Sequence, residues 1–263
     1  GLLVSCADDP GAAKVAAAAL ARSGSSGSLR SVTYGEAETA DYRLTAIAPA
    51  GMATEFELTH AGASVLPGHG PVRLRVEVPG RHNALNAAGA YATAAELGFG
   101  SADIAAGLAS YRGTQRRMEQ KGEADSVRVL DSYAHHPTEI AADLAAARDI
   151  AAGGRVIVVF QPHLYSRTRI FASEFGAALA LADEIFVLDV YAAREDPEPG
   201  VTGALITDAV PGGRGTFWPD RGSLPRVITD VAKPGDVVLT MGAGDVTHLG
   251  PQIVAALGAR ASG

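Results

Sequence analysis

The sequence lacks most features of secreted, membrane-spanning and nucleic-acid-binding proteins. Its single cysteine, Cys6, excludes an internal disulfide, and its histidines and cysteine do not have the spacing of a zinc site. Apolar runs such as Val156–Phe160 are far shorter than the roughly 18–20 residues of a membrane span. Acidic residues outnumber basic ones 29 to 22, so the net charge of −7 offers no overall attraction to nucleic acid. Because the apolar run Leu2–Ala7 has no basic leader, no signal peptide is predicted, and we expect a soluble protein of the cytoplasm.

Apolar residues, by contrast, are abundant. They make up 47% of the 263 residues, whereas charged residues make up 19%. Such a chain is too apolar to be disordered and can bury the core of one large domain or two small ones. Strand-length apolar runs alternate with longer Ala-rich segments of helical period, which predicts an α/β fold.

The first part of the chain predicts a parallel pair of strands followed by an antiparallel meander. Strands at Leu2–Ala7 and Ser31–Tyr34 flank a helix at Gly11–Arg22, which is expected to end at the Ser/Gly run Ser23–Ser28. Three further strands with short turns between them predict the meander. In the last of them valine and leucine alternate with arginine and glutamate, so one face is expected to be buried. These strands are Tyr42–Ala48, Met52–Thr59 and Val72–Val78, the turns are Pro49–Gly51 and Leu66–Gly68, and helices follow at Asn83–Leu97 and Ala102–Tyr111.

A basic, polar stretch at Arg112–Gly122 predicts a domain boundary, with domains at 1–111 and 112–263. Beyond it strands and helices alternate regularly, which favours a mostly parallel, doubly wound, Rossmann-like sheet that binds ligands at the carboxyl ends of its strands. The predicted strands are Val127–Ser132, Arg155–Phe160, Glu184–Val190 and Asp236–Met241, and the predicted helices are Thr138–Ile150, Thr168–Ala182, Leu224–Val231 and Val246–Leu257.

The motif Gly80–Asn86 lies at a predicted strand-to-helix junction. Asn83 is either a helix N-cap or, together with Asn86, a carboxamide that hydrogen-bonds a planar base through both a donor and an acceptor. The residues alone leave both interpretations open.

A second motif, Asp131–Glu139, follows a predicted strand, where this architecture places its ligand sites. His135 and His136 are adjacent and point in different directions, so they are not expected to share a metal. One of them is expected to contact an anionic group while the other caps the following helix.

A third motif, Phe160–Arg169, also follows a strand. Arg167 and Arg169 stand near a helix N-terminus and predict a carboxylate or phosphate site, because arginine offers a bidentate fork and the helix dipole attracts the same anion. A Gly-Ala-Gly-Asp turn at 242–245 is only weak support for nucleotide binding, and it is equally compatible with close strand–helix packing.

Five stretches resemble, in order and spacing, motifs of the Mur ligase family: GRHNALNA, LDSYAHHPTEI, FQPHLYSRTR, DVYAARE-DPEPG and LTMGAGD. The resemblance covers essentially the whole chain. It implies that residues 1–111 are the later half of a central ATP-binding (ATPase-type) domain and that residues 112–263 are the C-terminal Rossmann-like domain. The motifs are most similar to the branch that joins L-alanine to UDP-N-acetylmuramate, an ADP-forming amide ligation of peptidoglycan precursor synthesis that uses ATP and Mg²⁺.

The resemblance also implies roles for individual residues. Those on the nucleotide side are His82, Asn83 and Asn86 for adenine, Arg117 as an interdomain arginine, and Asp131 for the ribose or phosphates. Those that receive the amino acid are Tyr133, His135, His163, Arg167 and, as a second carboxylate contact, Arg169, with His135, His163 and Arg167 as the catalytic set. Two positions depart from the family pattern, since Leu164 stands where a second arginine is frequent and Ser132 where an aspartate is common.

A phosphate loop ending in Gly-Lys-Ser/Thr is absent, because none of Lys14, Lys121 and Lys233 follows a glycine. The family's Mg²⁺ ligands and UDP-binding domain have no counterpart either, so no metal ligand is assigned here. We therefore expect a C-terminal fragment that is inactive alone.

Three alternatives remain. The nearest is a ligase of the same family that recycles cell-wall peptides. A non-catalytic nucleotide-binding or interaction domain would leave the His/Arg motifs at the strand ends unexplained. An oxidoreductase would need G-x-G-x-x-G after the first strand of a βαβ unit, and none is found there.

Overall fold

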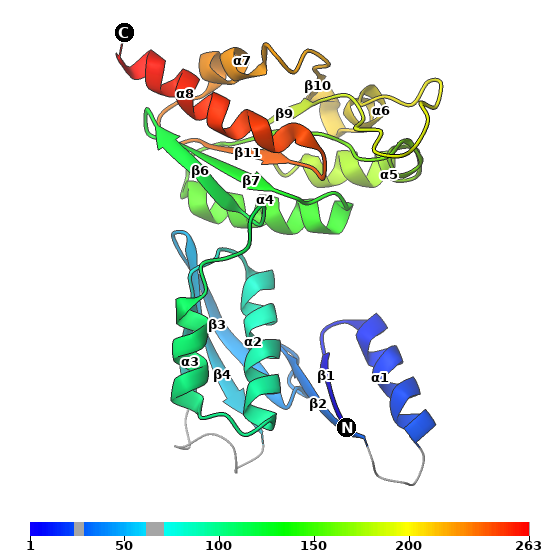
Figure 1. Ribbon diagram of the computed structural model, residues 1–263, viewed down its shortest axis with the longest axis vertical. Helices are drawn as coiled ribbons and strands as arrows, with labels where there is room; N and C mark the ends of the chain where they lie inside the picture. The colour runs from blue at the N-terminus through cyan, green and yellow to red at the C-terminus, as the bar shows by residue number, and fades with distance from the viewer. Residues whose placement is uncertain (24–28, 62–70, 263) are drawn as a thin grey trace. The chain divides into compact units, whose positions relative to one another are not determined.

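The computed structural model describes residues 1–23, 29–61 and 71–262, and it divides into two compact units, Gly1–Arg112 and Gly113–Gly263. Unit 1 contains a five-stranded sheet and unit 2 a six-stranded sheet, each packed against helices (Figure 1). The predicted α/β class, with an antiparallel meander before a mostly parallel sheet, is confirmed. The predicted turn at Leu66–Gly68 and all but the first residue of the Ser23–Ser28 run lie outside the described residues. Across the described ranges, no helix is both long enough and apolar enough to cross a membrane.

Unit 1 is built on a sheet with the strand order β1-β2-β3-β4-β5. Parallel pairing joins β1 (Leu2–Cys6), β2 (Arg30–Gly35) and β3 (Tyr42–Ala50), and antiparallel pairing adds β4 (Ala53–His60) and β5 (Val72–Val76). Figure 1 shows helices α2 and α3 lying together against this sheet and α1 beside β1. The helices are α1 (Pro10–Ser23), α2 (Arg81–Glu96) and α3 (Ser101–Ser110).

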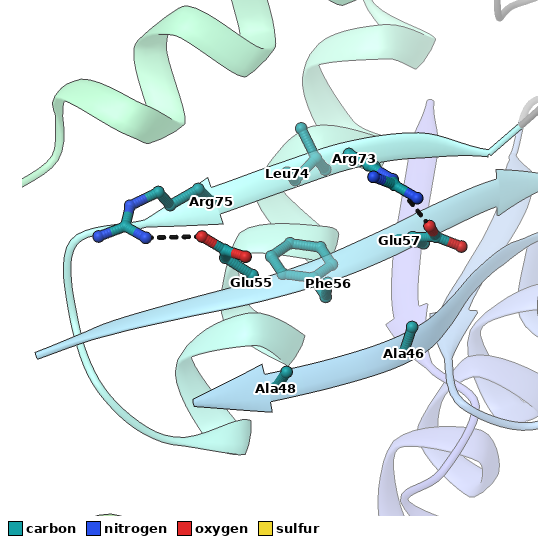
Figure 2. A pocket seen from close by; sticks show the side chains of 8 residues that line it. All are labelled: Ala46, Ala48, Glu55, Phe56, Glu57, Arg73, Leu74 and Arg75. Atoms are coloured by element: carbon teal, nitrogen blue, oxygen red, sulfur yellow. Dashed lines mark hydrogen bonds and ion pairs between the residues drawn. The ribbon is translucent and has the colours of Figure 1, made fainter. Parts of the chain in front are cut away.

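The expected alternation in β5 is present. Leu74 and Val76 are buried beneath the helices, whereas Arg73 and Arg75 are exposed on the other face. Arg75 lies directly opposite Glu55 on β4, with 2.6 Å between guanidinium and carboxylate (Figure 2). Arg73 pairs in the same way with a glutamate of β4 at 3.0 Å. Opposite charges directly across a strand pair stabilise the sheet weakly and keep its outer face solvated.

Unit 2 is a doubly wound sheet with the order β10-β9-β8-β11-β7-β6, in which only β6 is antiparallel. Helices α4 and α5 lie against one face, and α7 and α8 against the other (Figure 1). Every residue of β8 and β11 is buried, as expected for parallel strands covered on both faces. The strands are β6 (Glu119–Ala124), β7 (Val127–Ser132), β8 (Val156–Phe160), β9 (Glu184–Val187), β10 (Gly215–Phe217) and β11 (Val237–Met241). The helices are α4 (Pro137–Ala151), α5 (Tyr165–Leu179), α6 (Ala204–Asp208), α7 (Leu224–Val231) and α8 (Leu249–Ser262), with 3-10 turns η2 (Pro211–Gly213) and η3 (Asp245–His248).

The structure corrects the sequence interpretation at two places. The interpretation of the whole stretch Arg112–Gly122 as a boundary is wrong for its last four residues, which belong to the edge strand β6 and pair with β7. An edge strand accepts polar side chains because one of its sides faces water, so its sequence resembles that of a loop. The N-cap interpretation of Asn83 is also wrong, since α2 begins at Arg81 with Gly80 at its N-cap. The short elements α6 and β10 were not predicted, because five and three residues show no period.

Candidate functional site

A pocket of about 330 Å³ in unit 1 gathers the two predicted carboxamides. It opens where the chain after β5 meets the first turns of α2 and the end of α3. The side-chain amide of Asn83 donates to the carbonyl of Pro79 at 2.7 Å, which orients its carboxamide. His82, the third residue predicted on this side, is not among the lining residues. The lining consists of Val76, Val78, Asn83, Asn86, Ala87, Ala90, Gly107, Leu108 and Tyr111.

This pocket offers mostly apolar walls and two carboxamides. Its volume is at the low end of small-ligand pockets, which also have apolar walls and few polar groups. A carboxamide presents a donor and an acceptor side by side, the arrangement that a heterocyclic base needs. Because Asn83 already donates through Nδ2, its Oδ1 atom remains to accept a hydrogen bond.

In unit 2, four aromatic side chains form a row at the carboxyl ends of β7, β8 and β9. Tyr133 and His135 follow β7, His163 follows β8, and Tyr191 follows β9. Ring centroids are 5.4 Å apart from Tyr133 to His135 and 6.3 Å from His135 to His163. His163 and Tyr191 are stacked at 5.8 Å with 15° between their planes. The sequence predicted the first three of these residues to lie together, and the structure brings them together; we call the four rings the aromatic row.

Two polar atoms beside this row have no hydrogen-bond partner within the described part of the chain. They are Nδ1 of His163 and Nη1 of Arg167, and both atoms are buried. Burial and then the nearby charges of Arg167 and His135 lower the pKa of His163 below its ordinary value of 6.5. Because a buried polar atom without a partner costs free energy, these two atoms mark a place where a polar ligand would fit.

Of the two adjacent histidines, one caps the following helix, as the sequence predicted. His136 caps α4, where its ring accepts a hydrogen bond from the Thr138 amide at 3.3 Å. The carboxylate of Glu139 accepts from the amides of His135 and His136 and completes a capping box. His135 keeps its ring in the aromatic row, with Nδ1 at 2.9 Å from the carbonyl oxygen of Tyr133.

Asp131, predicted to reach the nucleotide, is fully buried at the end of β7. Its carboxylate accepts hydrogen bonds from Thr240 at 2.7 Å, Thr247 at 2.8 Å and Arg116 at 3.3 Å. These donors occupy the carboxylate, so Asp131 holds its neighbours in place rather than presenting a free charge. Arg117, the residue after Arg116 in the sequence, is exposed, and its guanidinium lies 3.9 Å from the carboxylate of Glu139.

The N-terminus of α5 is not free to bind an anion, contrary to the sequence expectation. Glu195 accepts hydrogen bonds there from the amide of Ser166 at 2.9 Å and from its hydroxyl, and these donors lower the pKa of the Glu195 carboxyl. Arg169 forms an ion pair with Glu198 at 2.9 Å on the exposed side of the helix. Of the two predicted arginines, Arg167 is the one with a buried guanidinium donor that has no partner in the described part of the chain.

The two departures from the family pattern have different surroundings. Ser132 is buried at the end of β7, where its hydroxyl donates to Asp143 of α4 and accepts from the Ala134 amide. Leu164 is the N-cap of α5 and has φ +73°, ψ 133°, a conformation that L-residues rarely adopt.

The Gly-Ala-Gly-Asp turn serves close packing. A Cβ atom at Gly242 would lie 2.4 Å from the carbonyl oxygen of Gln161, and one at Gly244 would lie 2.7 Å from Tyr191 Cγ. The structure thus shows close packing at this turn, although against the loops after β8 and β9 and not against a helix.

Known proteins with similar sequences are ligases of one family. A model of the Mur ligase glutamate ligase domain matches residues 116–244. The chain is 53% identical over 262 residues to a UDP-N-acetylmuramate–L-alanine ligase from Kineococcus radiotolerans, covering 99% of this chain and 53% of that protein. A ligase of the same name from Thermobifida fusca is 54% identical, with 95% and 52% covered. The chain is a homologue of the Mur ligases. It spans about half the length of the curated relatives it matches.

Solved Mur ligases share the fold of this homologue. A UDP-N-acetylmuramate–alanine ligase from Thermotoga maritima superposes with a TM-score of 0.71 at 28% identity, covering 88% of this chain and 48% of that one. A murein peptide ligase from Psychrobacter arcticus superposes with a TM-score of 0.63 at 20% identity, covering 98% and 51%. At that identity the second likeness concerns the fold alone.

Three site residues of this Mur ligase homologue were missed by sequence reasoning: Arg116, Tyr191 and Glu195. Arg116 lies 4.8 Å above the Tyr133 ring and donates to the carbonyl of Gly242, whereas the family resemblance implies a role for Arg117. The backbone has φ +59° at Arg116, so regular strand alternation does not apply and the sequence could not tell which arginine faces inward. Tyr191 follows a strand, and its position there could have indicated a site residue, because ligands bind at the carboxyl ends of strands in this architecture.

Proposed function

We propose that this chain is part of an ATP-dependent, ADP-forming ligase that joins L-alanine to UDP-N-acetylmuramate in the cytoplasm, during peptidoglycan precursor synthesis. The observation that carries the proposal is the 53% identity, along 99% of the chain, to a ligase of that name. In this proposal Gly1–Arg112 is the later half of the central ATP-binding domain and Gly113–Gly263 the C-terminal domain. The family match at 116–244, within the second unit, supports the latter assignment.

The pocket in unit 1 is proposed to bind adenine. With Nδ2 of Asn83 engaged by Pro79, Oδ1 is the atom that would accept a hydrogen bond from the exocyclic amine of adenine. Guanine carries a carbonyl at the equivalent position, and two acceptors would then face each other. Asn86 would supply the second carboxamide. His82 and Arg117 keep their predicted nucleotide-side roles as proposals from the resemblance, and Asp131 would act there by fixing Arg116.

The aromatic row is proposed to receive the amino acid. Arg167 would bind its carboxylate, because its guanidinium keeps an unused buried donor. In the reaction, ATP converts the muramyl carboxylate into an acyl phosphate; the amine then attacks the carbonyl carbon, an amide forms and phosphate leaves. The amine must lose a proton to react. His163, whose low pKa keeps its imidazole neutral at pH 7, would accept that proton at Nδ1. His135 and Tyr133 would line the same site.

Mg²⁺ supplies positive charge to phosphoryl transfer in such ligases. Within residues 1–23, 29–61 and 71–262, no group of three or more His, Cys, Asp or Glu side chains is placed to hold a metal ion. These residues therefore do not fit a Mg²⁺ site. Alone, the chain is expected to release no alanine-dependent phosphate from ATP.

The proposal can be tested by titrating this chain with L-alanine and following its amide signals by NMR. Arg167→Ala should weaken binding about 10- to 150-fold, the value of a charge-assisted bidentate contact of roughly 1.5–3 kcal/mol. Arg167→Lys should recover only part of the loss, because lysine keeps the charge without the fork. Arg169→Ala is the matched control, since Arg169 is already paired with Glu198.

Two outcomes would contradict the proposal. If Arg169→Ala weakens alanine binding as much as Arg167→Ala, the carboxylate lies elsewhere. If an alanine-containing cell-wall peptide binds and free L-alanine does not, the recycling ligase is the better reading of this site.

A further inference from the structure

We propose, on the basis of the function proposed above, that Tyr191 is a positioning residue that holds the His163 imidazole in the orientation in which Nδ1 meets the incoming amine. Tyr191 would act through His163 and would not itself take part in the reaction. It comes from the loop after β9, whereas His163 comes from the loop after β8, so the pair joins two strand ends.

Ring stacking is the first support. The His163 and Tyr191 planes differ by 15° at a centroid distance of 5.8 Å, the most nearly parallel ring pair in the aromatic row. Tyr191 is 38% exposed, whereas the Nδ1 atom of His163 is buried. His163 also contacts His135, whose ring centroid lies 6.3 Å from its own. Two rings of the aromatic row therefore contact the imidazole, and Tyr191 is the more nearly parallel of the two.

The backbone fixes the same pair. His163 and Tyr191 form a parallel bridge, in which the Tyr191 amide donates to the carbonyl of Pro162 at 2.8 Å and the Leu164 amide donates to the carbonyl of Tyr191 at 3.0 Å. These bonds hold Leu164 at its unfavourable φ of +73°. A residue in such a conformation persists only where its surroundings enforce it, and this one determines how the chain leaves His163 toward Arg167.

Gly244 supports the Tyr191 ring from behind. A Cβ atom there would lie 2.7 Å from Cγ and 2.9 Å from Cβ of Tyr191, distances that real Cβ atoms do not reach. The ring thus rests directly on the backbone of the turn after β11. A side chain at position 244 would collide with Tyr191 and also with the side-chain oxygen of Gln161, which would lie 2.4 Å from its Cβ atom.

Loss of the Tyr191 ring should change the titration of His163 in a defined direction. Burial is the largest cause of the low pKa of His163, so exposing one face of its ring should raise that pKa toward 6.5. The other groups that face His163 remain: Arg167, His135 and Arg194 lower its pKa, and Glu195 raises it. A merely structural role of Tyr191 would leave this titration unchanged in a folded variant.

The test is an NMR titration of the His163 ring protons in this chain, with Tyr191→Leu, Tyr191→Phe and Gly244→Ala. The leucine and Gly244→Ala variants should raise the His163 pKa and weaken alanine binding roughly 2- to 10-fold, as expected for one lost aromatic pair. Phenylalanine keeps the ring and should preserve both values. Tyr133→Leu is the control, because Tyr133 contacts His135 rather than His163 and should leave the His163 pKa unchanged.

Two results separate this inference from the proposed function. If Tyr191→Leu is folded and leaves the His163 pKa and alanine binding unchanged, Tyr191 does not position His163. If the pKa rises as expected while the unmodified chain binds no alanine, the positioning role stands and the proposed substrate fails.

Discussion

The two units stabilise their sheets to different degrees. In unit 2 all five residues of β8 and all five of β11 are buried between helices, whereas in unit 1 every residue of β1 is only half-buried. Helix α1, which packs on β1, buries only Ala16 and leaves Val15 68% exposed. Parallel strands gain most of their stability from helices on both faces. The contrast therefore predicts that β1 and α1 contribute little to the stability of unit 1, while β8 and β11 dominate that of unit 2.

The candidate sites of the two units also differ, in the polar groups that they contain. The pocket in unit 1 offers two carboxamides between apolar walls, and carboxamides do not titrate near neutral pH. At the strand ends in unit 2, by contrast, burial and the charges of Arg167 and His135 lower the pKa of His163. The function proposed above thus assigns base recognition to the first unit and proton transfer to the second.

The largest expected effect compares two leucines. Leu239→Ala in β11 removes a fully buried side chain and should lower the free energy of unfolding of unit 2 by about 3–5 kcal/mol. Leu3→Ala in the half-buried β1 should cost about 1 kcal/mol or less in unit 1. Trp218, the single tryptophan, lies in unit 2, so its fluorescence in urea reports the first variant, and amide hydrogen exchange of β1 reports the second. Equal costs would contradict the contrast between the units.

The next effect concerns a charge buried in unit 2. Asp236 is 4% exposed; burial opposes its ionisation, but hydrogen bonds from Arg155 and from the Lys233 and Arg155 amides outweigh it and lower its pKa below 3.8. A carboxyl with a lowered pKa stabilises the fold above its unfolded value of 3.8, and that contribution is lost as the pH falls through the folded value. Asp236→Asn should therefore cost about 1.5–3 kcal/mol at pH 7.

The same urea experiment at several pH values checks this prediction. The difference between the natural chain and Asp236→Asn should be constant above about pH 5 and should shrink below about pH 3.8. A difference that persists unchanged at pH 2.5–3 would show that the variant acts by distorting the loop and not by removing the charge.

Much of the fold could be predicted because its signals are local. The all-apolar run of β8, the mostly apolar run of β11 and the alternation in β5 each identified a strand. The capping residues at the start of α4 could be recognised from a Pro and a Glu at fixed offsets. The edge strand β6 was not predicted, since its stability comes from pairing with β7 and its polar sequence reveals nothing of that partner.

The types of residue in the candidate sites could be predicted, but which of their side chains contact one another could be predicted less well. The sequence placed His163 and Arg167 at one strand end, and topology brought that strand end beside the loop of His135. It could not show that Glu195, from the next loop, occupies the N-terminus of α5, because this contact joins residues 29 apart. Nor could it show that Arg116, which has a positive φ, is the arginine that contacts Asp131 and Tyr133.

The smallest expected effect lies in unit 1, on the outer face of the meander (Figure 2). Glu57 and Arg73 pair at 3.0 Å, but the Arg73 side chain is 88% exposed, so solvent screens the attraction. A double-mutant cycle of Glu57→Gln and Arg73→Gln should give a coupling of about 0.2–0.5 kcal/mol, and 1 M salt, where the Debye length is about 3 Å, should abolish it. The corresponding cycle of Asp236→Asn and Arg155→Gln should give a larger coupling that salt changes little, because the Asp236 carboxylate is buried. If the exposed pair couples as strongly as the buried one, burial is not what distinguishes the electrostatics of the two units.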